Sequence, residues 1–68
     1  MVGFGNYIRG KKEVFGRLHT EVEVAGRRYF RSDRSGTWRT DCYENVHPSA
    51  RFKLEDAYSR LAKEPGRN

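Results

Sequence analysis

Arginine and tyrosine side chains recur through the stretch from residue 27 to residue 43. The residues that could act together are Arg27, Tyr29, Arg31, Arg34, Arg39 and Tyr43, with Lys11 and Lys12 earlier in the chain. A guanidinium group forms forked hydrogen bonds to phosphate or carboxylate and stacks on flat rings, and a tyrosine ring can stack on a nucleobase. This pattern indicates a binding surface for an anionic partner.

The charge of the chain is positive and unevenly distributed. The net charge is +5, from ten arginines and four lysines against nine acidic residues. Residues 27–39 hold five arginines against Asp33 alone, whereas residues 13–24 hold three glutamates against Arg17. Positive charge interleaved with aromatic rings on an open sheet is typical of nucleic-acid binding. The same residues would also suit an acidic protein surface, or form a solvated face without a partner.

Residues for catalysis or metal binding are few. Cys42 and His47, with His19 as a third candidate, fall short of the four ligands of a structural zinc site. We expect Cys42 to be a buried small hydrophobic residue rather than a nucleophile. The sequence therefore predicts no enzymatic activity, no metal site and no cofactor.

Alternating polar and apolar residues predict two β-hairpins end to end between residues 20 and 43. The first turns at Ala25-Gly26, and the second ends in a strand over 37–43. Because successive side chains of a strand point to opposite faces, Trp38 and Cys42 are expected on the same, inner face.

The register of the first hairpin decides which side chains face outward. A two-residue loop needs a positive φ at Ala25, which its Cβ disfavours, so we expect a three-residue loop over 24–26. This register places Val22 and Phe30 on the inner face. The expected outer face carries Glu21, Glu23, Arg27, Tyr29, Arg31, Arg39 and Tyr43.

The first third of the chain predicts two further strand segments. Residues 1–8 form a plausible strand, and a turn is expected at 9–11. One long strand over 13–24, bent at Gly16, explains the unbroken apolar side of that segment. The alternative is two separate strands broken at Gly16.

The last third predicts an amphipathic helix that begins after Pro48, with Ser49 as its N-cap. Residues 64–66 end the helix. The apolar residues recur at helical spacing: Phe52, Leu54, Ala57, Tyr58, Leu61 and Ala62.

These elements together predict an α+β fold. We expect a four-stranded antiparallel sheet, with a half-closed barrel as the alternative, and a C-terminal helix packed on the inner face. Residues 1–64 would form a single domain and residues 65–68 a mobile tail. A domain of this size has a folding free energy of only about 3–5 kcal/mol.

Two resemblances concern the arrangement of these elements. Trp38 on a third strand, followed by Phe52 and a helix opened by Glu55-Asp56-Ala57-Tyr58, resembles AP2-type and integrase-arm DNA-binding domains. The resemblance implies a three-stranded sheet that reads DNA and packs on one helix. This chain departs from the pattern at 44–48, which replace the strand that leads into the helix. In size and charge the chain also resembles small phage and plasmid proteins that inhibit host machinery.

The sequence thus predicts a small, basic, non-catalytic binding module. Its expected partner is nucleic acid, either DNA or RNA, bound through the arginine- and tyrosine-rich face. The alternative is an inhibitor or adaptor that binds an acidic protein surface. A third hypothesis is a homodimer or larger assembly formed through an exposed edge strand. The chain holds no long apolar run, and we expect a cytoplasmic protein without a membrane partner.

Overall fold

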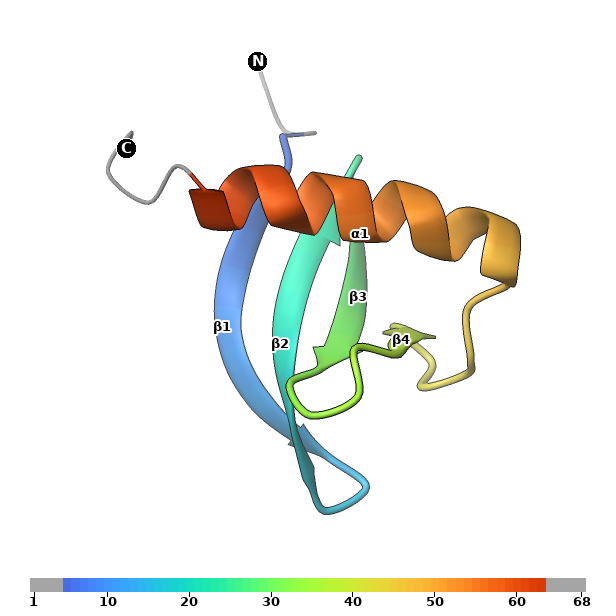
Figure 1. Ribbon diagram of the computed structural model, residues 1–68. Helices are drawn as coiled ribbons and strands as arrows, with labels where there is room; N and C mark the ends of the chain where they lie inside the picture. Colours follow the sequence, from blue (N-terminus) through green and yellow to red (C-terminus); the bar gives the residue numbers. More distant parts are fainter. Residues whose placement is uncertain (1–4, 64–68) are drawn as a thin grey trace.

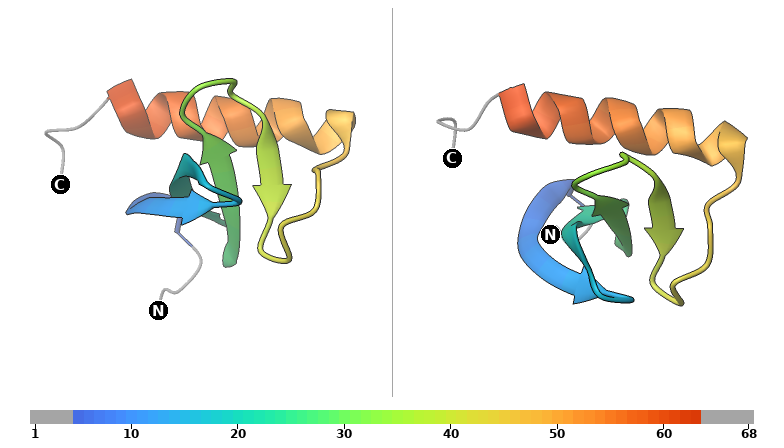
Figure 2. Two further views of the ribbon diagram at one scale, coloured as in Figure 1. Left: turned by 90° about the horizontal axis from the view of Figure 1, so that it is seen from below. Right: turned by 60° about the horizontal axis from the view of Figure 1, so that its bottom comes forward.

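Four strands and one helix make up the computed structural model, which describes residues 5–63 (Figure 1). The elements follow in the order β1 (Tyr7–Val14), β2 (Arg17–Val24), β3 (Arg27–Ser32), β4 (Trp38–Thr40) and α1 (Pro48–Lys63). Each strand pairs antiparallel with the next, and α1 lies across one face of the sheet. The strands curl strongly below the helix (Figure 2). The predicted α+β fold, a four-stranded antiparallel sheet with a C-terminal helix, is confirmed.

The first two hairpins turn on the dipeptides Phe15-Gly16 and Ala25-Gly26. The φ angles are 53° and 75° in the first turn and 53° and 83° in the second. Positive φ at both central residues is the signature of a tight hairpin turn whose twist matches that of the flanking strands. The predicted long strand over 13–24 is therefore wrong, because the chain reverses at Gly16 and β1 pairs with β2.

Strand β1 continues through the segment predicted to be a turn at 9–11. The pairing shifts between Ile8 and Gly10, so Arg9 is an extra residue in a β-bulge. A bulge absorbs one residue without reversing the chain, which is why a Gly-containing segment stays in the strand. Of the predicted strand over 1–8, Tyr7 and Ile8 belong to β1, and residues 1–4 lie outside the described residues.

The register between β2 and β3 differs from the predicted one by one residue. Val22 lies opposite Tyr29 and Thr20 opposite Arg31. A one-residue shift moves every side chain of a strand to the other face. Tyr29 and Arg31 therefore lie on the face of Val22 rather than pointing outward. Phe30, predicted beside Val22, lies on the opposite face.

The helix covers the sheet face that carries Val22 and Trp38. These two side chains and Leu54 of α1 form a buried cluster. Partly buried apolar residues pack around it: Val24, Tyr29, Val46, Tyr58 and Leu61. The prediction that Trp38 and Val22 face the helix, together with Leu54, Tyr58 and Leu61, is confirmed.

The start of the helix and the end of the sheet differ from prediction in detail. The His47 carbonyl accepts the first helical hydrogen bonds, and His47 Nδ1 accepts the Ser49 N–H at 3.1 Å. His47 is therefore the N-cap in place of Ser49. Phe52, predicted within the apolar stripe, is exposed.

Strand β4 ends at Thr40, three residues before the predicted Tyr43. Cys42 consequently lies in an exposed turn, and the prediction that it is buried on the inner face is wrong. The predicted tail at 65–68 lies outside the described residues. Within residues 5–63, no helix has the length and apolar character needed to cross a membrane.

Candidate functional site

Aromatic rings gather on the sheet face turned away from α1, which is called the open face below. Phe30 is buried there, and the Tyr43 ring packs on it with a centroid distance of 5.4 Å. The Phe15 ring meets Tyr43 edge-on at 5.9 Å. Lys12 Nζ lies 5.7 Å from the centre of the Phe30 ring, and Arg39 Cζ lies 5.0 Å from that of Phe15. The open face therefore combines a row of three rings with a cation at each end.

Phe15 combines two uncommon properties. Its side chain is 70% exposed at the tip of the β1–β2 hairpin, and its backbone has a φ of 53°. A left-handed backbone costs an ordinary L-residue about 1–2 kcal/mol, and glycine, asparagine or aspartate usually occupies this turn position. Neither burial nor backbone preference explains a phenylalanine here. Strained positions of this kind concentrate at functional sites.

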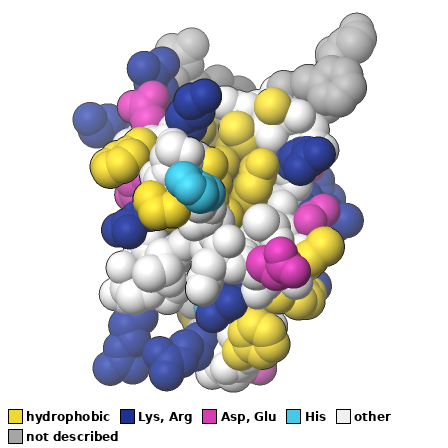
Figure 3. Space-filling view, turned by 90° about the vertical axis from the view of Figure 1, so that its right-hand side faces the viewer, with side chains coloured by type: hydrophobic (Ala, Val, Ile, Leu, Met, Phe, Trp, Pro, Cys, Tyr) yellow, Lys and Arg dark blue, Asp and Glu magenta, His cyan; other side chains and the backbone are white. Residues whose placement is uncertain are grey.

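Four cations surround this hairpin tip: Lys12, Arg17, Arg34 and Arg39. Among residues 5–63, no carboxylate lies within ion-pair distance of any of them. The nearest acids along the chain are Glu13 beside Lys12, Asp33 beside Arg34, and Asp41 two residues after Arg39. In Figure 3, Lys and Arg side chains gather at the lower end of the molecule, away from the helix, beside hydrophobic ones. We call the four cations with Phe15 and Tyr43 the basic end.

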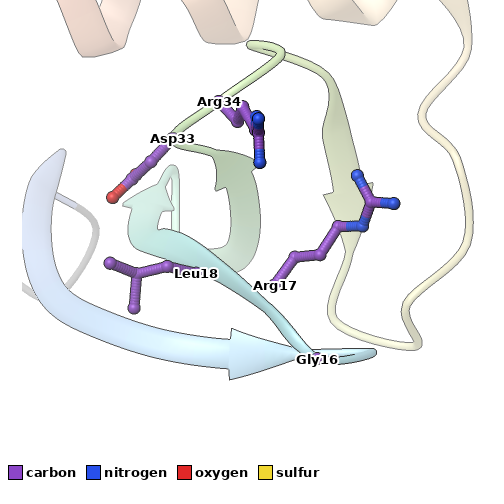
Figure 4. A pocket seen from close by; sticks show the side chains of 5 residues that line it. All are labelled: Gly16, Arg17, Leu18, Asp33 and Arg34. Carbon is purple, nitrogen blue, oxygen red and sulfur yellow. The ribbon is translucent and has the colours of Figure 1, made fainter.

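Two hollows open at the basic end. The first has a volume of about 440 Å³ and is lined by Gly16, Arg17, Leu18, Asp33 and Arg34. Figure 4 shows Asp33 pointing toward β1 and Arg17 toward β4. The second has a volume of about 240 Å³ and is lined by Val14, Phe15, Arg17, His19, Ser32, Ser35, Thr37 and Arg39. Arg17 lines both hollows, so its guanidinium can serve a ligand that spans them.

The other end of the open face is electrically neutralised. Arg9 contacts Glu23 at 2.9 Å and Glu21 at 3.5 Å, and Arg28 contacts Glu21 at 3.5 Å. Two arginines thus face two glutamates. For the part of the chain that the structure describes, the free positive charge of the open face therefore lies at the basic end.

Several residues predicted to bind a partner do not join the basic end. Arg31 donates to both carboxylate oxygens of Glu55, at 3.0 and 3.2 Å, and lies over the Tyr58 ring at 4.5 Å. Tyr29 is half-buried on the same helix-covered face. The predicted outward orientation of Arg31 and Tyr29 is wrong, because the β2–β3 register turns both toward α1.

Lys11 and Arg27 are also separate from the basic end. Lys11 Nζ contacts Asp33 at 2.6 Å and donates to Thr20 Oγ1 at 2.9 Å. The hydrogen bonds that Asp33 accepts from Lys11 and from Thr20 hold the pKa of Asp33 below its ordinary value, with Lys11 as the largest cause. Arg27 pairs with Val24 beside the Ala25-Gly26 turn, at the opposite end of the sheet. Of the predicted site residues, Lys12, Arg34, Arg39 and Tyr43 come together.

Sequence reasoning missed Phe15 and Arg17. The signal that could have found them is the Phe15-Gly16 dipeptide between two alternating stretches, which is a hairpin signal of the same kind as Ala25-Gly26. A hairpin at this point places Phe15 at a tip and Arg17 beside it. Because Gly16 was interpreted as a bend in a long strand, neither Phe15 nor Arg17 was predicted to belong to the site.

Cys42 lies in the same turn as Tyr43. Cys42 lies in an exposed turn, and its acidic neighbour Asp41, then Glu44, raises the pKa of its thiol above the ordinary value. A raised pKa leaves little thiolate near neutral pH, opposite to what a nucleophile requires. Within residues 5–63, no three His, Cys, Asp or Glu side chains are grouped so as to hold a metal ion.

Comparisons of the chain with models of protein families, with curated proteins and with solved structures found no match.

Proposed function

We propose that this protein is a non-catalytic module that binds single-stranded nucleic acid, DNA or RNA, through the basic end of its open face. The observation that carries the proposal is Phe15, held exposed in a left-handed turn with Arg39 over its ring. An exposed ring surrounded by unpaired cations is the combination with which proteins stack bases and hold a phosphate backbone. Unstacked bases are needed for such contacts, which favours a single strand over a duplex. The proposed setting is the cytoplasm.

In this proposal the aromatic residues and the basic residues of the site have different roles. Phe15 and Tyr43 offer ring surface to a base. Arg39 lies over the Phe15 ring, Lys12 over the Phe30 ring, and Arg17 and Arg34 line the adjacent hollow. Together the four cations can contact about four phosphates. For a protein that contacts four phosphates of a single strand, the log of the association constant should fall with the log of the salt concentration at a slope of about −2.8.

The experiment is a fluorescence-anisotropy titration of labelled mixed-sequence DNA and RNA single strands at several salt concentrations. Arg17→Ala should weaken binding and reduce the slope by about 0.7, because one phosphate contact is lost. Phe15→Asn should weaken binding by about 1–3 kcal/mol with the slope unchanged, because stacking releases no counterion.

Matched controls exist elsewhere on the chain. Arg27→Ala removes an exposed arginine at the other end of the sheet. Phe52→Ala removes a ring that is 76% exposed on the helix. Neither change should alter binding by more than the error of the titration. Equal losses for Arg17 and Arg27, or no binding at low salt, would overturn the proposal.

The second candidate function is binding of an acidic protein surface, and Phe52 is the observation that favours it. Phe52 lies beside Arg51 near the start of α1, and both line a hollow of about 310 Å³. An exposed ring next to an arginine is the composition of a protein-interface anchor. This candidate predicts that Phe52→Ala, rather than Phe15→Asn, abolishes partner binding, and a pull-down with the two variants decides between them.

A further inference from the structure

The second hollow of the basic end, which we call the cup, is lined by buried residues and by more exposed ones. Three buried residues, Val14, His19 and Ser32, contribute to its lining. More exposed residues surround them: Phe15 and Arg17 at the hairpin tip, Ser35 and Thr37 in the β3–β4 loop, and Arg39 on β4. The lining therefore comes from three separate segments. Figure 4 shows Arg17 extending from β2 toward β4, the strand that carries Arg39.

The cup is rich in hydrogen-bond donors. Arg39 uses one N–H, from Nη1, to donate to the Tyr43 carbonyl at 2.9 Å, and a guanidinium has five N–H groups in all. Ser32 Oγ accepts the Ser35 N–H at 3.2 Å, which leaves the hydroxyl proton of Ser32 to donate. Ser35 and Thr37 share one hydroxyl proton across 2.9 Å, so the other remains. Guanidinium and hydroxyl donors thus converge on the cup from different sides.

His19 adds a ring nitrogen of defined character. Its Nδ1 lies 2.9 Å from the Arg17 carbonyl oxygen. A carbonyl only accepts, so Nδ1 carries a proton and Nε2 is the second nitrogen of the ring. Within residues 5–63, every buried side-chain nitrogen and oxygen has a hydrogen-bond partner, so Nε2, for which the structure gives none, is open to solvent. In this tautomer, Nε2 can accept a hydrogen bond from a protonated phosphate oxygen.

The charge of the cup favours an anion. Its lining includes two arginines and no carboxylate. Asp33, the acid of the adjacent loop, is held by Lys11 and Thr20, each at 2.6 Å. A ligand in the cup therefore meets two unpaired guanidinium groups without a competing carboxylate.

We propose that the cup binds the terminal phosphate of a nucleic-acid strand, with the base of the same nucleotide stacked on Phe15. A volume of about 240 Å³ has room for roughly eight water molecules at about 30 Å³ each, so a hydrated phosphate group fits. A terminal phosphate presents three oxygens with a charge near −2, whereas an internal phosphate has two free oxygens and a chain on both sides. Donors converging from three segments match the terminal group. This inference rests on the proposed function, and it adds that the protein recognises the phosphorylated end of a strand.

The experiment compares one labelled single strand in three forms, with a 5′-phosphate, with a 3′-phosphate and with hydroxyls at both ends. One phosphorylated end should bind about tenfold tighter or more than the hydroxyl form, the gain expected for charge-assisted hydrogen bonds. The double variant Ser35→Ala/Thr37→Val should reduce that gain while leaving the affinity for the hydroxyl form unchanged. Equal affinity for all three forms would overturn the inference while leaving the proposed function intact.

A second measurement separates this inference from the proposed function. Inorganic phosphate added to the isotope-labelled protein should shift the NMR signals of Arg17, Arg39 and Ser35, and chloride at equal ionic strength should not. A strand that fails to bind while inorganic phosphate still shifts these signals would contradict the proposed function and, with it, the strand end as the ligand, and would leave the cup as a phosphate site only. Shifts spread over Arg27 and Lys53 as well would show only general charge screening and would overturn the cup.

Discussion

At the scale of single residues, the left-handed backbone at Phe15, Ala25 and Tyr43 distinguishes the turns of this chain. The three φ angles are 53°, 53° and 66°. Ala25 has no exposed aromatic surface to offer, so its conformation is explained by the hairpin alone. Its N–H also donates to Asn6 Oδ1 at 3.1 Å, which holds the turn against the chain before β1. Phe15 has the same backbone strain and a large exposed ring in addition.

This contrast gives a prediction for two matched substitutions. Ala25→Asn should raise the free energy of unfolding by about 1 kcal/mol, because asparagine adopts the left-handed conformation more readily. Phe15→Asn relieves the same strain but loses the contacts of the ring with Tyr43 and Arg39, so stability should change little. Urea denaturation of both variants measures this. A large loss of stability in Phe15→Asn would mean that the ring is kept for folding rather than binding.

Cys42 gives a prediction about accessibility. Because Cys42 lies in an exposed turn, a thiol reagent should reach it in the native protein as easily as in urea. At a pH where the thiol is deprotonated, the labelling rates in the native and the unfolded protein should therefore be equal. The raised pKa of the thiol, caused first by Asp41, should make native labelling slow at neutral pH and faster as the pH rises. Asp41→Asn should increase the neutral rate. Native labelling that stays slow at high pH would indicate a buried sulfur.

At the scale of elements, one carboxylate joins two strands to the helix. Glu55 of α1 accepts two hydrogen bonds from Arg31 of β3, and its Oε1 also accepts the indole N–H of Trp38 at 2.9 Å. The hydrogen bond to Glu55 raises the pKa of Arg31 above its ordinary value, and the bond from Arg31 holds the pKa of Glu55 below its ordinary value. The helix is thereby fixed in position along the sheet as well as packed on it.

The lowered pKa of Glu55 predicts a stability change in acid. A carboxyl with a lower pKa in the folded state stabilises the fold above its unfolded pKa of about 4.5, and that contribution is lost as pH falls through the folded value. Asp33, whose pKa is also lowered, acts in the same direction. Glu55→Gln should therefore flatten the fall in melting temperature between neutral pH and pH 3, relative to the native chain. An unchanged pH profile would show that the Arg31 pair contributes nothing to folding.

Trp38 gives the corresponding prediction for the packing of β4 on the helix. Trp38→Ala removes a buried ring from the cluster with Val22 and Leu54 and should cost about 3–5 kcal/mol, which is most of the stability of a domain this small. Arg27→Ala, an exposed position on the neighbouring strand, should be nearly neutral. Circular dichroism in urea compares the two. A small loss at Trp38 would place the core elsewhere.

Hydrophobic periodicity predicted the architecture but not the register. The alternation around Val22 and the spacing of Leu54, Tyr58 and Leu61 identify the apolar faces, because burial dominates at those positions. The register depended on the conformation of one residue, Ala25. Its intrinsic preference argued for a three-residue loop, yet the observed turn matches the twist of the strands, and the register lets Arg31 reach Glu55. The strand twist and the tertiary contacts therefore outweighed the local backbone preference of Ala25.

The candidate site was only partly predictable for the same reason. Lys12, Arg34, Arg39 and Tyr43 were identified as basic and aromatic residues, and they do lie at the basic end. Whether an arginine is free to bind a ligand depends on whether it forms an ion pair with a carboxylate. The ion pairs in turn depend on the strand register, which the sequence left undetermined. A single shifted residue transferred Arg31 from the predicted binding face to an ion pair with the helix.

At the scale of the whole molecule, the two faces of the sheet have different partners. One face packs on α1 around Val22, Trp38 and Leu54. The open face has a smaller buried group around Phe30 and Val14, covered by the hairpin tip and the turn that carries Tyr43. The open face is therefore stable without a second helix, and its basic end remains accessible for a ligand.

The remaining route to a partner is the edge of the sheet, where β1 leaves one side of an eight-residue strand unpaired within residues 5–63. Two features oppose pairing with a second copy. The β-bulge at Arg9 interrupts the regular spacing of backbone groups, and Gly10 sits there with a φ of 143°. Lys11 and Lys12 follow directly, and lysines on an edge strand repel a second copy of the same strand. The other edge, β4, has only three residues and is followed by a bridge from Arg39 to Asn45.

We therefore expect a monomer in solution, contrary to the edge-strand homodimer considered from the sequence. Sedimentation velocity over a wide concentration range should show a single species with the mass of one chain, 8.0 kDa. Lys12→Val, which removes one protecting charge and favours strand pairing, should increase self-association, whereas Lys53→Val on the helix should not. A concentration-dependent dimer of the native chain would show that the bulge and the lysines do not protect this edge. A dimer that persists in Lys12→Val at the native level would place the contact on another surface, because a contact through β1 must respond to a side chain on β1.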